Sequence, residues 1–490
     1  MSYLGIDIGT SSCKAVVFNA DGRPAAPRAV RNYKITSPLP GFAELDPSIV
    51  MTCCFEVISE AAKSASEKIA AICVSSQGEA FTPIGTDGKA LDNAMVSSDS
   101  RSLECMNDFT TVFGSEKLYR ITGHTPSTLF SLFKLLWLKQ NKPHVFANAR
   151  KILCFEDLLA FSLGVEPAMG WPLAGRTMLF DIAKHEWSHE ILDALDLPSD
   201  KLAKVLPSGS VAGQIPDEYA SSLGLPKGVK FVTGGHDQTI GALGAGVFEA
   251  GDAMYAAGSV ECICPVIPEL TLTQTLFRNN LCSYDYPLPG LWTTVAYSLT
   301  GSNLVDYFRN TLGNGEDYSI LTGEMPDFPT SLLTLPYFTP SGTPYFDQKT
   351  PACIYGMRMT TSRGELLKGM LEGIALEMKL NLTILEESGI HIERFMATGG
   401  GCRNPHLVQL KADVLNRPLM CPSVEESGCR GAALLAQSAD ENMSVKELSH
   451  LRMESGEYIT PRTEYAQFYE EKFEKYKHFS LSVRNLFKKN

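Results

Sequence analysis

The sequence predicts an α/β fold divided into two domains. The chain has 490 residues, too many for one hydrophobic core, so two domains of roughly 200–250 residues each are expected. Apolar strand-like runs alternate with helical patterns, which is typical of α/β domains. A strand, a small glycine-hydroxyl turn and a return strand also occur once in each half of the chain.

These two hairpins lie about half the chain apart, which suggests two halves with related cores. Their strands are, in chain order, Tyr3–Ile8 and Cys13–Phe18, then Asp252–Ala257 and Val260–Val266. The turns between the strands are residues 9–12 in the first hairpin and Gly258-Ser259 in the second. Each half is therefore expected to present one hairpin tip.

We expect a first domain over residues 1–246, a second over 247–440 and a C-terminal helical extension over 441–490. The boundary falls at residues 241–246, a stretch of small residues that is expected to act as a hinge. Residues 267–350 are rich in Pro, Tyr and Thr and are interpreted as irregular excursions from a core.

The second half carries the clearest helix signals. Ser362 and Glu365 form a capping box for a helix over residues 362–388, and Gly389 ends it. The other expected elements are a strand over Ile392–Thr398, a helix from Pro405 to Leu415 with Asn404 as its N-cap, and a surface helix within residues 465–490.

The composition excludes several classes of protein. A formal net charge of -12 argues against a nucleic-acid binder, which needs a basic face. An anionic substrate stays open, because local loops and a metal can hold phosphate. We see no signal peptide and no apolar run near the length of a membrane span. The 13 cysteines lack C-x-x-C spacing and are interpreted as reduced thiols, so we expect a cytoplasmic protein.

The most informative segment is residues 234–240, Gly-Gly-His-Asp-Gln-Thr-Ile, which follow a strand-like run. A carboxylate at a strand end, with glycine allowing close backbone approach, is well placed to take a proton from a substrate hydroxyl. Asp237 is thus the candidate catalytic base, although it could equally cap a helix that begins near Thr239. His236 and Gln238 are candidates for substrate binding, and His236 could equally fill the loop.

The first hairpin tip is a candidate phosphate-binding turn, with a plain hairpin turn as the alternative. Its candidate nucleotide contacts are Gly9, Thr10, Ser11 and Ser12. Lys14 on the return strand could add positive charge. Asp7 could hold Mg²⁺ through waters, since Mg²⁺ gives up its hydration reluctantly. No Walker A pattern is present, which argues against a P-loop enzyme.

Two further glycine segments are candidates for the nucleotide. Residues 399–405, Gly-Gly-Gly-Cys-Arg-Asn-Pro, join an expected strand to an expected helix, and a base could lie on this flat surface. A tight structural turn is the alternative, and the missing G-x-G-x-x-G spacing disfavours a dinucleotide fold. Gly258-Ser259 is a second phosphate loop by analogy with the first.

Polar clusters follow the strand-like run at residues 69–74, and ligands bind at strand ends in open α/β sheets. A polyhydroxyl substrate needs such a mixture of donors and acceptors. The candidate substrate contacts are Gln77, Gly78, Glu79, Asp99 and Arg101. Ordinary surface positions are the alternative for each of them.

In this order, the segments resemble the FGGY carbohydrate kinases, a family within the actin–hexokinase–sugar-kinase fold. The resemblance spans about residues 3–440. Shorter pieces that agree are residues 41–47, Lys134-Leu135-Leu136-Trp137, Gly175-Arg176-Thr177, Phe180-Asp181, Leu335-Pro336-Tyr337 and Gly431-Ala432-Ala433.

The resemblance implies two actin-like (ribonuclease H-like) domains, with ATP and sugar in a central cleft between them. It implies that Asp237 is the general base and that Asp7 is the carboxylate on the Mg²⁺ side. It places in the nucleotide site Thr10, Ser259, Gly301, Gly400, Gly401 and Asn404. Domain closure would then exclude water, so that ATP phosphorylates sugar rather than being hydrolysed.

The resemblance is less specific for the substrate. Xylulose kinases carry Gln-Met-His-Gly where this chain has residues 77–80, and Glu79 resembles the Arg-Glu of glycerol kinases with Gly78 in place of the arginine. Residues 99–101 resemble the D-x-R of xylulose kinases, although Ser97 replaces a preceding tryptophan. We expect an ATP-dependent kinase of a ketopentose such as xylulose. The alternatives are a kinase of a polyol such as glycerol or erythritol, an inactive sugar-binding regulatory protein, and a chaperone-type ATPase; the sequence leaves a homodimer open.

Overall fold

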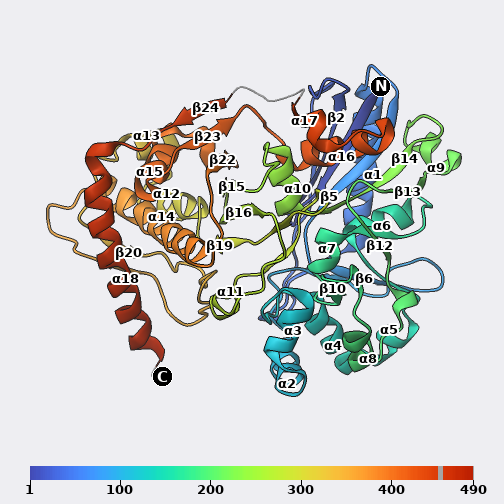
Figure 1. Ribbon diagram of the computed structural model, residues 1–490, viewed down its shortest axis with the longest axis horizontal. Coiled ribbons are helices and arrows are strands. Elements are labelled where there is room, and N and C mark those ends of the chain that lie inside the picture. The colour runs from blue at the N-terminus through green and yellow to red at the C-terminus, as the bar shows by residue number, and fades with distance from the viewer. Residues whose placement is uncertain (451–455, 489–490) are drawn as a thin grey trace.

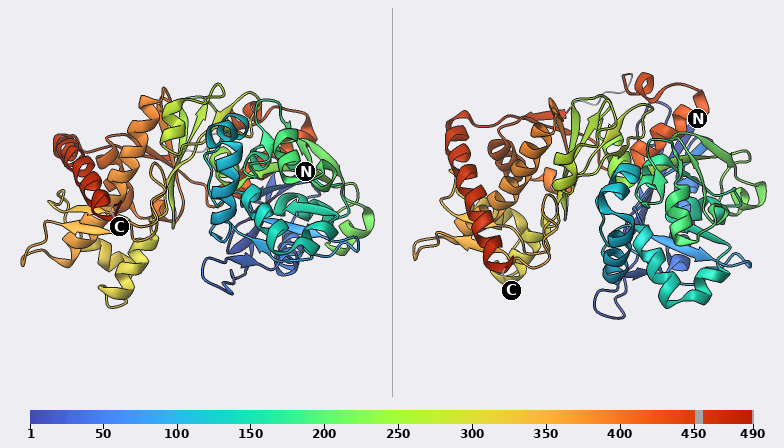
Figure 2. Two further views of the ribbon diagram at one scale, coloured as in Figure 1. Left: turned by 90° about the horizontal axis from the view of Figure 1, so that it is seen from below. Right: turned by 60° about the horizontal axis from the view of Figure 1, so that its bottom comes forward.

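The computed structural model describes residues 1–450 and 456–488. It has two halves, each built on a central sheet, and the chain order runs from the blue-green half to the yellow-red half in Figure 1. The views in Figure 2 show the same two halves side by side. The α/β architecture predicted from the alternation of strands and helices is confirmed.

The first sheet has the order β13-β14-β5-β1-β2-β3. Its strands are β1 (Ser2–Ile8), β2 (Ser12–Asn19), β3 (Ala29–Asn32), β5 (Ile69–Ser76), β13 (Val211–Gln214) and β14 (Lys230–His236). The hairpin β1–β2 is antiparallel, whereas β5 runs parallel to both β1 and β14. The ends of β1, β5 and β14 therefore open at the same edge of the sheet.

The second sheet repeats this arrangement around β15 (Asp252–Ala257) and β16 (Glu261–Ile267). These strands form an antiparallel hairpin, and β22 and β23 continue the sheet in parallel with β15. The remaining strands of this sheet and its extension are β17 (Tyr284–Asp285), β18 (Trp292–Thr293), β19 (Ala296–Ser298), β22 (Arg394–Thr398), β23 (Leu419–Pro422) and β24 (Gly456–Ile459). The expected pair of related hairpins is confirmed.

Small strands and helices connect and cover the sheets. In the first half they are α1 (Pro47–Ser64), α2 (Leu103–Phe113), α3 (Ser115–Thr122), α4 (Ser131–Asn141), α5 (Pro143–Asn148), α6 (Phe155–Ser162), α7 (Trp171–Gly175), α8 (His189–Leu195), α9 (Asp217–Ser222), α10 (Asp237–Gly244), and the strands β4 (Glu44–Leu45), β6 (Phe81–Ile84), β7 (Ala94–Met95), β8 (Lys151–Cys154), β9 (Ala168–Gly170), β10 (Phe180–Asp181), β11 (Glu186–Trp187) and β12 (Lys204–Leu206). In the second half they are α11 (Gln274–Arg278), α12 (Asn303–Thr311), α13 (Tyr318–Gly323), β20 (Leu333–Leu335), β21 (Cys353–Tyr355), α14 (Arg363–Glu387), α15 (Pro405–Leu415), α16 (Ser427–Glu441), α17 (Val445–His450) and α18 (Ala466–Lys488).

The local helix signals of the second half are confirmed. Helix α14 begins with the expected capping box, in which Ser362 and Glu365 each accept from the other's backbone N–H. Helix α15 begins at Pro405 with Asn404 as its N-cap and ends at Leu415. Short-range side-chain chemistry therefore sets these boundaries before tertiary packing acts on them.

Most of the stretch 241–246, which was expected to act as a hinge, is helix α10, and its role as a hinge stays a prediction. A Cβ at Gly244 would collide with the Ser427 carbonyl of α16, and a Cβ at Gly431 would collide with the Ile240 carbonyl of α10. Small residues serve here to bring two helix backbones into contact, as glycine alone permits.

Helix α16 follows the second sheet in the chain, yet it lies on the first half in Figure 1. It packs across β1 and β5, and a Cβ at Gly5 would collide with the Cys429 carbonyl. This helix was expected in the domain over residues 247–440, and in space it covers the first sheet. The division into residues 1–246, 247–440 and 441–490 stays a prediction.

The C-terminal helix α18 packs against α14 and β20. Glu372 of α14 receives hydrogen bonds from Tyr469 and Lys472, and all three side chains are buried. A buried carboxylate is tolerated because its oxygens are paired with a cation and hydroxyl groups. The expected terminal helix is confirmed, and its apolar and polar contacts make it part of the second core.

Candidate active site

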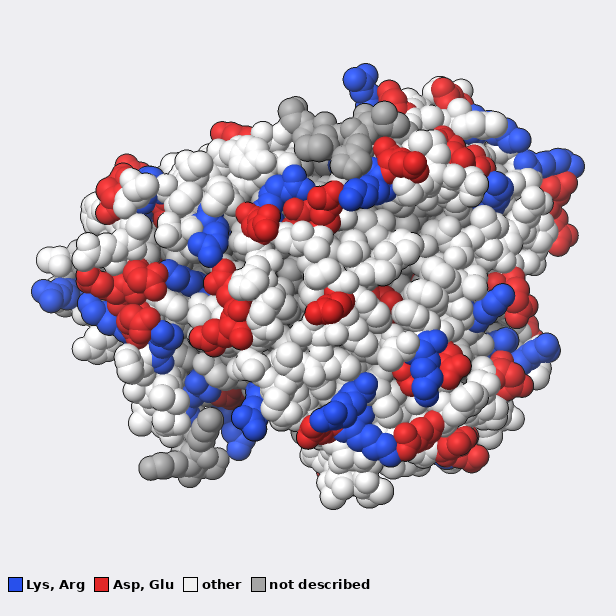
Figure 3. All heavy atoms as spheres, viewed as in Figure 1, with Lys and Arg blue, Asp and Glu red and all other residues white. Residues whose placement is uncertain are grey.

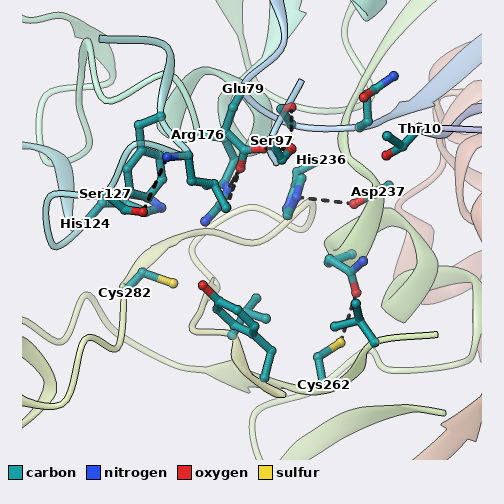
Figure 4. Close-up of a pocket in the computed structure, with 18 of the residues that line it drawn as sticks. Thr10, Glu79, Ser97, His124, Ser127, Arg176, His236, Asp237, Cys262 and Cys282 are labelled. Atoms are coloured by element: carbon teal, nitrogen blue, oxygen red, sulfur yellow. Dashed lines mark hydrogen bonds and ion pairs between the residues drawn. The ribbon is translucent and has the colours of Figure 1, made fainter. Parts of the chain in front are cut away.

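A cavity of about 440 Å³ lies between the two halves, lined by side chains from both. Figure 4 shows Glu79, Arg176, His236 and Asp237 along one wall and Cys262 and Cys282 along the facing wall. The predicted site residues that line it are Thr10, Gln77, Gly78, Glu79, His236, Asp237, Gln238 and Gly258. The cavity therefore joins the first hairpin tip, the ends of β5 and β14, and the second hairpin tip.

Asp237 is the first residue of α10, directly after β14. The end of this strand is fixed by a hydrogen bond to Glu156 and by close packing against β5. Glu156 accepts the backbone N–H of Gly234 at 2.7 Å, and a Cβ at Gly234 would collide with the Val74 carbonyl of β5. The glycine is thus required for β14 to run close to β5, and this contact sets where the carboxylate emerges.

The carboxylate of Asp237 has the electrostatic character of a base that works near neutrality. Burial, and then the negative charges of Asp7 and Glu79, raise its pKa to about 7. The Asp237 side chain is nevertheless 29% exposed, because it faces the cavity. A general base is most effective when its pKa is close to the working pH. Asp237 is not an N-cap, because His236 occupies that position.

His236 links Asp237 to a tyrosine of the second half. Its Nε2 lies 3.2 Å from Oδ1 of Asp237, and its Nδ1 lies 2.9 Å from the hydroxyl of Tyr284. Burial lowers the pKa of His236 well below its usual range, and the charge of Arg176 adds to this. A neutral imidazole that accepts from Tyr284 at Nδ1 carries its proton at Nε2, facing the carboxylate.

Glu79 is held in a defined position at the opposite end of the same wall. One oxygen accepts from Nε of Arg176 at 2.6 Å, and the other accepts from the Ser97 hydroxyl at 2.6 Å. The backbone of Glu79 has φ 65, a left-handed conformation that costs a non-glycine residue energy and often marks a functional site. Glu79 is predicted from the sequence as a site residue, whereas its pairing with Arg176 and Ser97 is not.

The two hairpin tips contribute unequally to the cavity. Thr10 and Gly258 line it, whereas Ser259 is exposed outside it and Gly301 packs against the backbone of Gly258 and Ser259. Gly9, Ser11 and Ser12 form the turn, in which the N–H of Gly9 donates to the Ser12 carbonyl at 2.9 Å. Lys14 points to Glu426, with Nζ at 2.9 Å from the carboxylate. It is therefore paired outside the cavity.

The late glycine loop reaches the cavity only through Gly399. Gly400 has open space where a Cβ would be, and Gly401 packs against Ala257. Asn404 is occupied structurally, since its oxygen accepts from the His406 N–H and its amide donates to Thr322. Its role as a nucleotide contact stays a prediction.

Asp99 and Arg101 are not in the cavity, which corrects the expectation that they bind substrate. Asp99 is fully buried, accepts the Ala43 N–H at 2.7 Å and is paired with Arg101. The Arg101 guanidinium also binds Glu44 at 2.7 Å and lies 3.6 Å from the ring centre of Phe42. The two polar residues do act together, but they form a buried ion cluster with Glu44 and do not face the cavity.

Asp7 lies next to the cavity at the end of β1 and accepts from the Ser75 hydroxyl at 2.7 Å. Burial raises its pKa, while Ser75 and Lys14 oppose that shift. Besides burial, the charge of Asp7 raises the pKa of Asp237, so a divalent cation near Asp7 would favour the ionised form of both carboxyl groups. The donor set suits Mg²⁺, which takes one or two carboxylates and completes its shell with water and phosphate. Within residues 1–450 and 456–488, no three acidic, His or Cys side chains form a ready-made metal cluster.

Several lining residues were missed because they come from segments without a recognisable local motif. They are Ser97, His124, Thr125, Ser127, Leu129, Phe130, Arg176, Ala256, Val260, Cys262, Asn280, Cys282, Val295, Tyr297 and Phe346. Arg176 could have been found, since it lies in Gly175-Arg176-Thr177, one of the pieces that carried the resemblance.

Comparison with known proteins decides the family. The model of the FGGY family of carbohydrate kinases matches with its N-terminal domain at residues 2–244 and with its C-terminal domain at residues 274–439. The chain belongs to this family. The kinase therefore has the two-domain α/β fold and the carbohydrate kinase activity expected from its motifs.

Relatives of this kinase act on different substrates. A xylulose kinase of Lactococcus lactis is 27% identical over 444 residues, covering 89% of this chain and 87% of that protein. A glycerol kinase of Thermococcus kodakarensis is 30% identical over 467 residues, covering 91% of this chain and 90% of that protein. The crystal structure of ligand-bound xylulose kinase from Lactobacillus acidophilus has a TM-score of 0.92 at 22% identity, covering 100% of this chain and 99% of that chain. In the described part of the kinase, no helix combines the length and apolarity that crossing a bilayer requires.

Proposed function

We propose that this kinase transfers the γ-phosphoryl group of ATP to a primary hydroxyl of a ketopentose such as xylulose. The observation that carries the proposal is Asp237, a carboxylate with a pKa of about 7 in a cavity between the sugar-side groups and the two hairpin tips. The same proposal includes a cytoplasmic location, with the sugar and ATP as the molecules that the kinase binds.

In the proposed reaction, the substrate hydroxyl donates its proton to Asp237 while its oxygen attacks the γ-phosphorus. The bond from the γ-phosphorus to the β–γ bridging oxygen breaks, and ADP leaves. His236 orients the carboxylate from its Nε2 side, and Tyr284 fixes the imidazole. Thr10 and Gly258 face the phosphate side of the cavity. The protein thus positions the reactants and accepts a proton, as phosphoryl transfer requires.

Mg²⁺ would be held by Asp7 through waters and by the ATP phosphates. When bound, the ion neutralises charge on the phosphates and so favours attack by an oxygen nucleophile. Asp7 is suited to this role because Ser75 holds one carboxylate oxygen at the end of β1. Ser11, Ser12, Gly400 and Gly401 are proposed to approach the nucleotide when the two halves close on it.

The sugar is proposed to lie between Glu79 and Asp237. Glu79, Arg176, Gln77 and Asn280 supply acceptors and donors, while Phe130, Val295 and Phe346 supply an apolar wall. A small sugar needs both, because its hydroxyl groups must all be paired when they leave water.

One observation favours a second substrate class, a polyol such as glycerol or erythritol. The resemblance to glycerol kinases calls for an arginine at position 78, where this kinase has glycine. Arg176, which directly follows α7, contacts the Glu79 carboxylate instead. The test is an ATP-coupled activity screen over pentuloses, hexuloses, glycerol, erythritol and aldonates. The highest kcat/KM on a pentulose supports the first proposal, and the highest on a polyol supports the second. Activity on none of them would favour the inactive regulatory protein.

We predict that kcat/KM rises with pH through about 7. Asp237 must be deprotonated to accept the substrate proton, and its pKa is raised to about 7. Below that pH the protonated form dominates, so the rate falls about tenfold for each pH unit. Steady-state kinetics from pH 5.5 to 9 measure this. A kcat/KM that stays flat from pH 5.5 to 9, as a carboxyl group with an ordinary pKa of about 4 would give, would contradict the assignment.

We predict that Glu79→Gln raises KM for the sugar by about tenfold or more, with a smaller effect on kcat. The substitution keeps the size of the side chain but removes a charged hydrogen bond acceptor, and hydrogen bonds to charged groups contribute about 1.5–3 kcal/mol. Glu186→Gln is the control, because Glu186 is exposed on β11. An unchanged KM in Glu79→Gln would remove Glu79 from the sugar site.

A further inference from the structure

A second cavity, of about 280 Å³, lies behind the sugar-side wall of the active site. It is formed by the C-terminal end of α18, the end of α11 and the segment 344–350. Three cationic side chains line it: Arg278, Lys349 and Arg484. Figure 3 shows Lys and Arg side chains gathered near this end of α18, on a protein whose net charge is -12.

Arg484 is the decisive residue. Its side chain is only 7% exposed, yet its Nε is buried without a partner. Within the described part of the chain, Arg484 makes no hydrogen bond and no ion pair; its contact is with the ring of Tyr345, whose centre lies 3.4 Å from the guanidinium carbon. That contact uses the face of the guanidinium and leaves its N–H edges for another partner. A buried guanidinium with unpaired N–H groups is costly, so a ligand is expected to satisfy it.

The acidic residue beside it does not take this role. Both oxygens of Asp347 are occupied by Thr350 and by the N–H of Lys349, at 2.5–3.0 Å. Burial opposes its ionisation, but the hydrogen bonds from Thr350 and the charge of Arg484 lower the pKa of Asp347. Asp347 is therefore ionised and shapes the loop, and Arg278 and Arg484 together still outnumber it in the cavity.

The two cavities share a wall. Asn280 lines both of them and donates to the Pro344 carbonyl at 2.8 Å. Phe346 lines the sugar cavity, while its neighbours Tyr345 and Asp347 line the cationic cavity. Phe346 and Asn280 both have a left-handed backbone, with φ 50 and φ 55. A ligand that moves the segment 344–347 would thus move groups that touch the sugar.

We propose that this second cavity binds a small phosphate-bearing anion and that its occupancy changes sugar binding through the segment 344–347. Phosphate suits the site because a guanidinium pairs with two phosphate oxygens at once, and a second cation strengthens the pairing. The source is free inorganic phosphate or a phosphorylated metabolite, which share this chemistry. Only the coupling to sugar rests on the proposed function.

The experiment titrates the full-length kinase with inorganic phosphate, and separately with glucose 6-phosphate, by calorimetry. Saturating non-hydrolysable ATP analogue and Mg²⁺ fill the nucleotide site. Arg484→Gln is expected to weaken binding at least about tenfold, the effect of losing a charge-assisted pair. Arg278→Gln, at an exposed position of the same cavity, is expected to weaken it about threefold and serves if Arg484→Gln does not fold. Lys475→Gln, on an exposed face of α18, is the matched control and should bind as wild type.

Binding of both anions identifies phosphate itself as the ligand, and binding of glucose 6-phosphate alone identifies a phosphate ester. No binding at millimolar concentration, or equal binding by wild type and both cavity variants, overturns the site. For the coupling, phosphate should slow hydrogen exchange in residues 341–347 and shift KM for xylulose at least twofold in wild type but not in Arg484→Gln. If phosphate leaves hydrogen exchange in residues 341–347 unchanged, the proposed coupling between the two cavities is wrong. A lack of activity on xylulose contradicts the proposed substrate, and the exchange result then decides the coupling by itself.

Discussion

Replacing Asp237 by Asn is expected to lower kcat by about 10²–10⁴-fold, the usual contribution of a positioned general base. Asn keeps the size of the side chain but accepts no proton from the sugar hydroxyl. The fold and both binding sites should survive, because the exposed part of the Asp237 side chain faces the cavity and the substitution adds no bulk. Coupled kinetics give kcat, and calorimetry with ATP and with the sugar gives the two dissociation constants.

The control for this experiment is Asp193→Asn, which removes an exposed carboxylate from α8. It should leave both kcat and the dissociation constants unchanged. If Asp237→Asn turned over within a factor of ten of wild type, Asp237 would not be the base. A variant that lost sugar affinity but kept kcat would instead make Asp237 a binding residue.

Gly244→Ala is expected to destabilise the kinase by about 3 kcal/mol or more, at the upper end for overpacking because the clash involves backbone on both sides. The new Cβ would lie within the Ser427 carbonyl, and the N–H of Gly431 lies just beyond it. Helices α10 and α16 would have to separate, although α16 covers β1 and β5 and α10 packs beside β5 and β14. Thermal and urea unfolding of the purified variant measure the loss.

Gly323→Ala is the matched control, since Gly323 is also the last residue of a helix and its Cβ would meet no atom within 4 Å. Alanine there should leave stability unchanged or raise it by up to about 1 kcal/mol, because glycine is the poorer helix residue. Equal stability of the two variants would show that α10 and α16 have room to adjust. The interpretation of this contact as a tight helix pair would then be wrong.

The close contact between α10 and α16 also affects the active site. Helix α10 begins at Asp237, and the N-terminal end of α16 reaches Asp7, whose carboxyl carbon would lie 2.9 Å from a Cβ at Gly428. The candidate base and the candidate metal-side carboxylate are thus both held against this helix pair. The stretch 241–246, expected from the sequence to act as a hinge, thus lies mostly in a helix pair that packs beside the two acidic groups.

Much of the fold could be predicted because its signals are local. The hairpin strands alternate with glycine turns, the capping box of α14 lies within four residues, and Asn404-Pro405 marks the start of α15. Asp237 was found for the same reason, as a polar residue placed by glycines at the end of a strand. Such patterns depend on the backbone of a few neighbouring residues, which the sequence states directly.

The partners of the selected residues could not be predicted, because they are distant in the chain. Arg176 reaches Glu79 over 97 positions, and Tyr284 reaches His236 over 48. Conversely, Asp99 and Arg101 carried a polar signal like that of Glu79 but fold into a buried ion cluster with Glu44. Whether a polar side chain faces a cavity or an internal partner depends on which segments pack beside it.

The sequence alone determined the family, the two hairpin-based halves and the acidic residue that is proposed to take the proton. The tertiary structure alone decided which polar side chains meet in the cavity, that α16 returns to cover the first sheet, and that an unpaired arginine of α18 faces a second cavity behind the sugar wall. The physical reason is that turns, caps and strands follow from short-range chemistry, whereas electrostatic environment and side-chain pairing arise only when distant segments exclude water together.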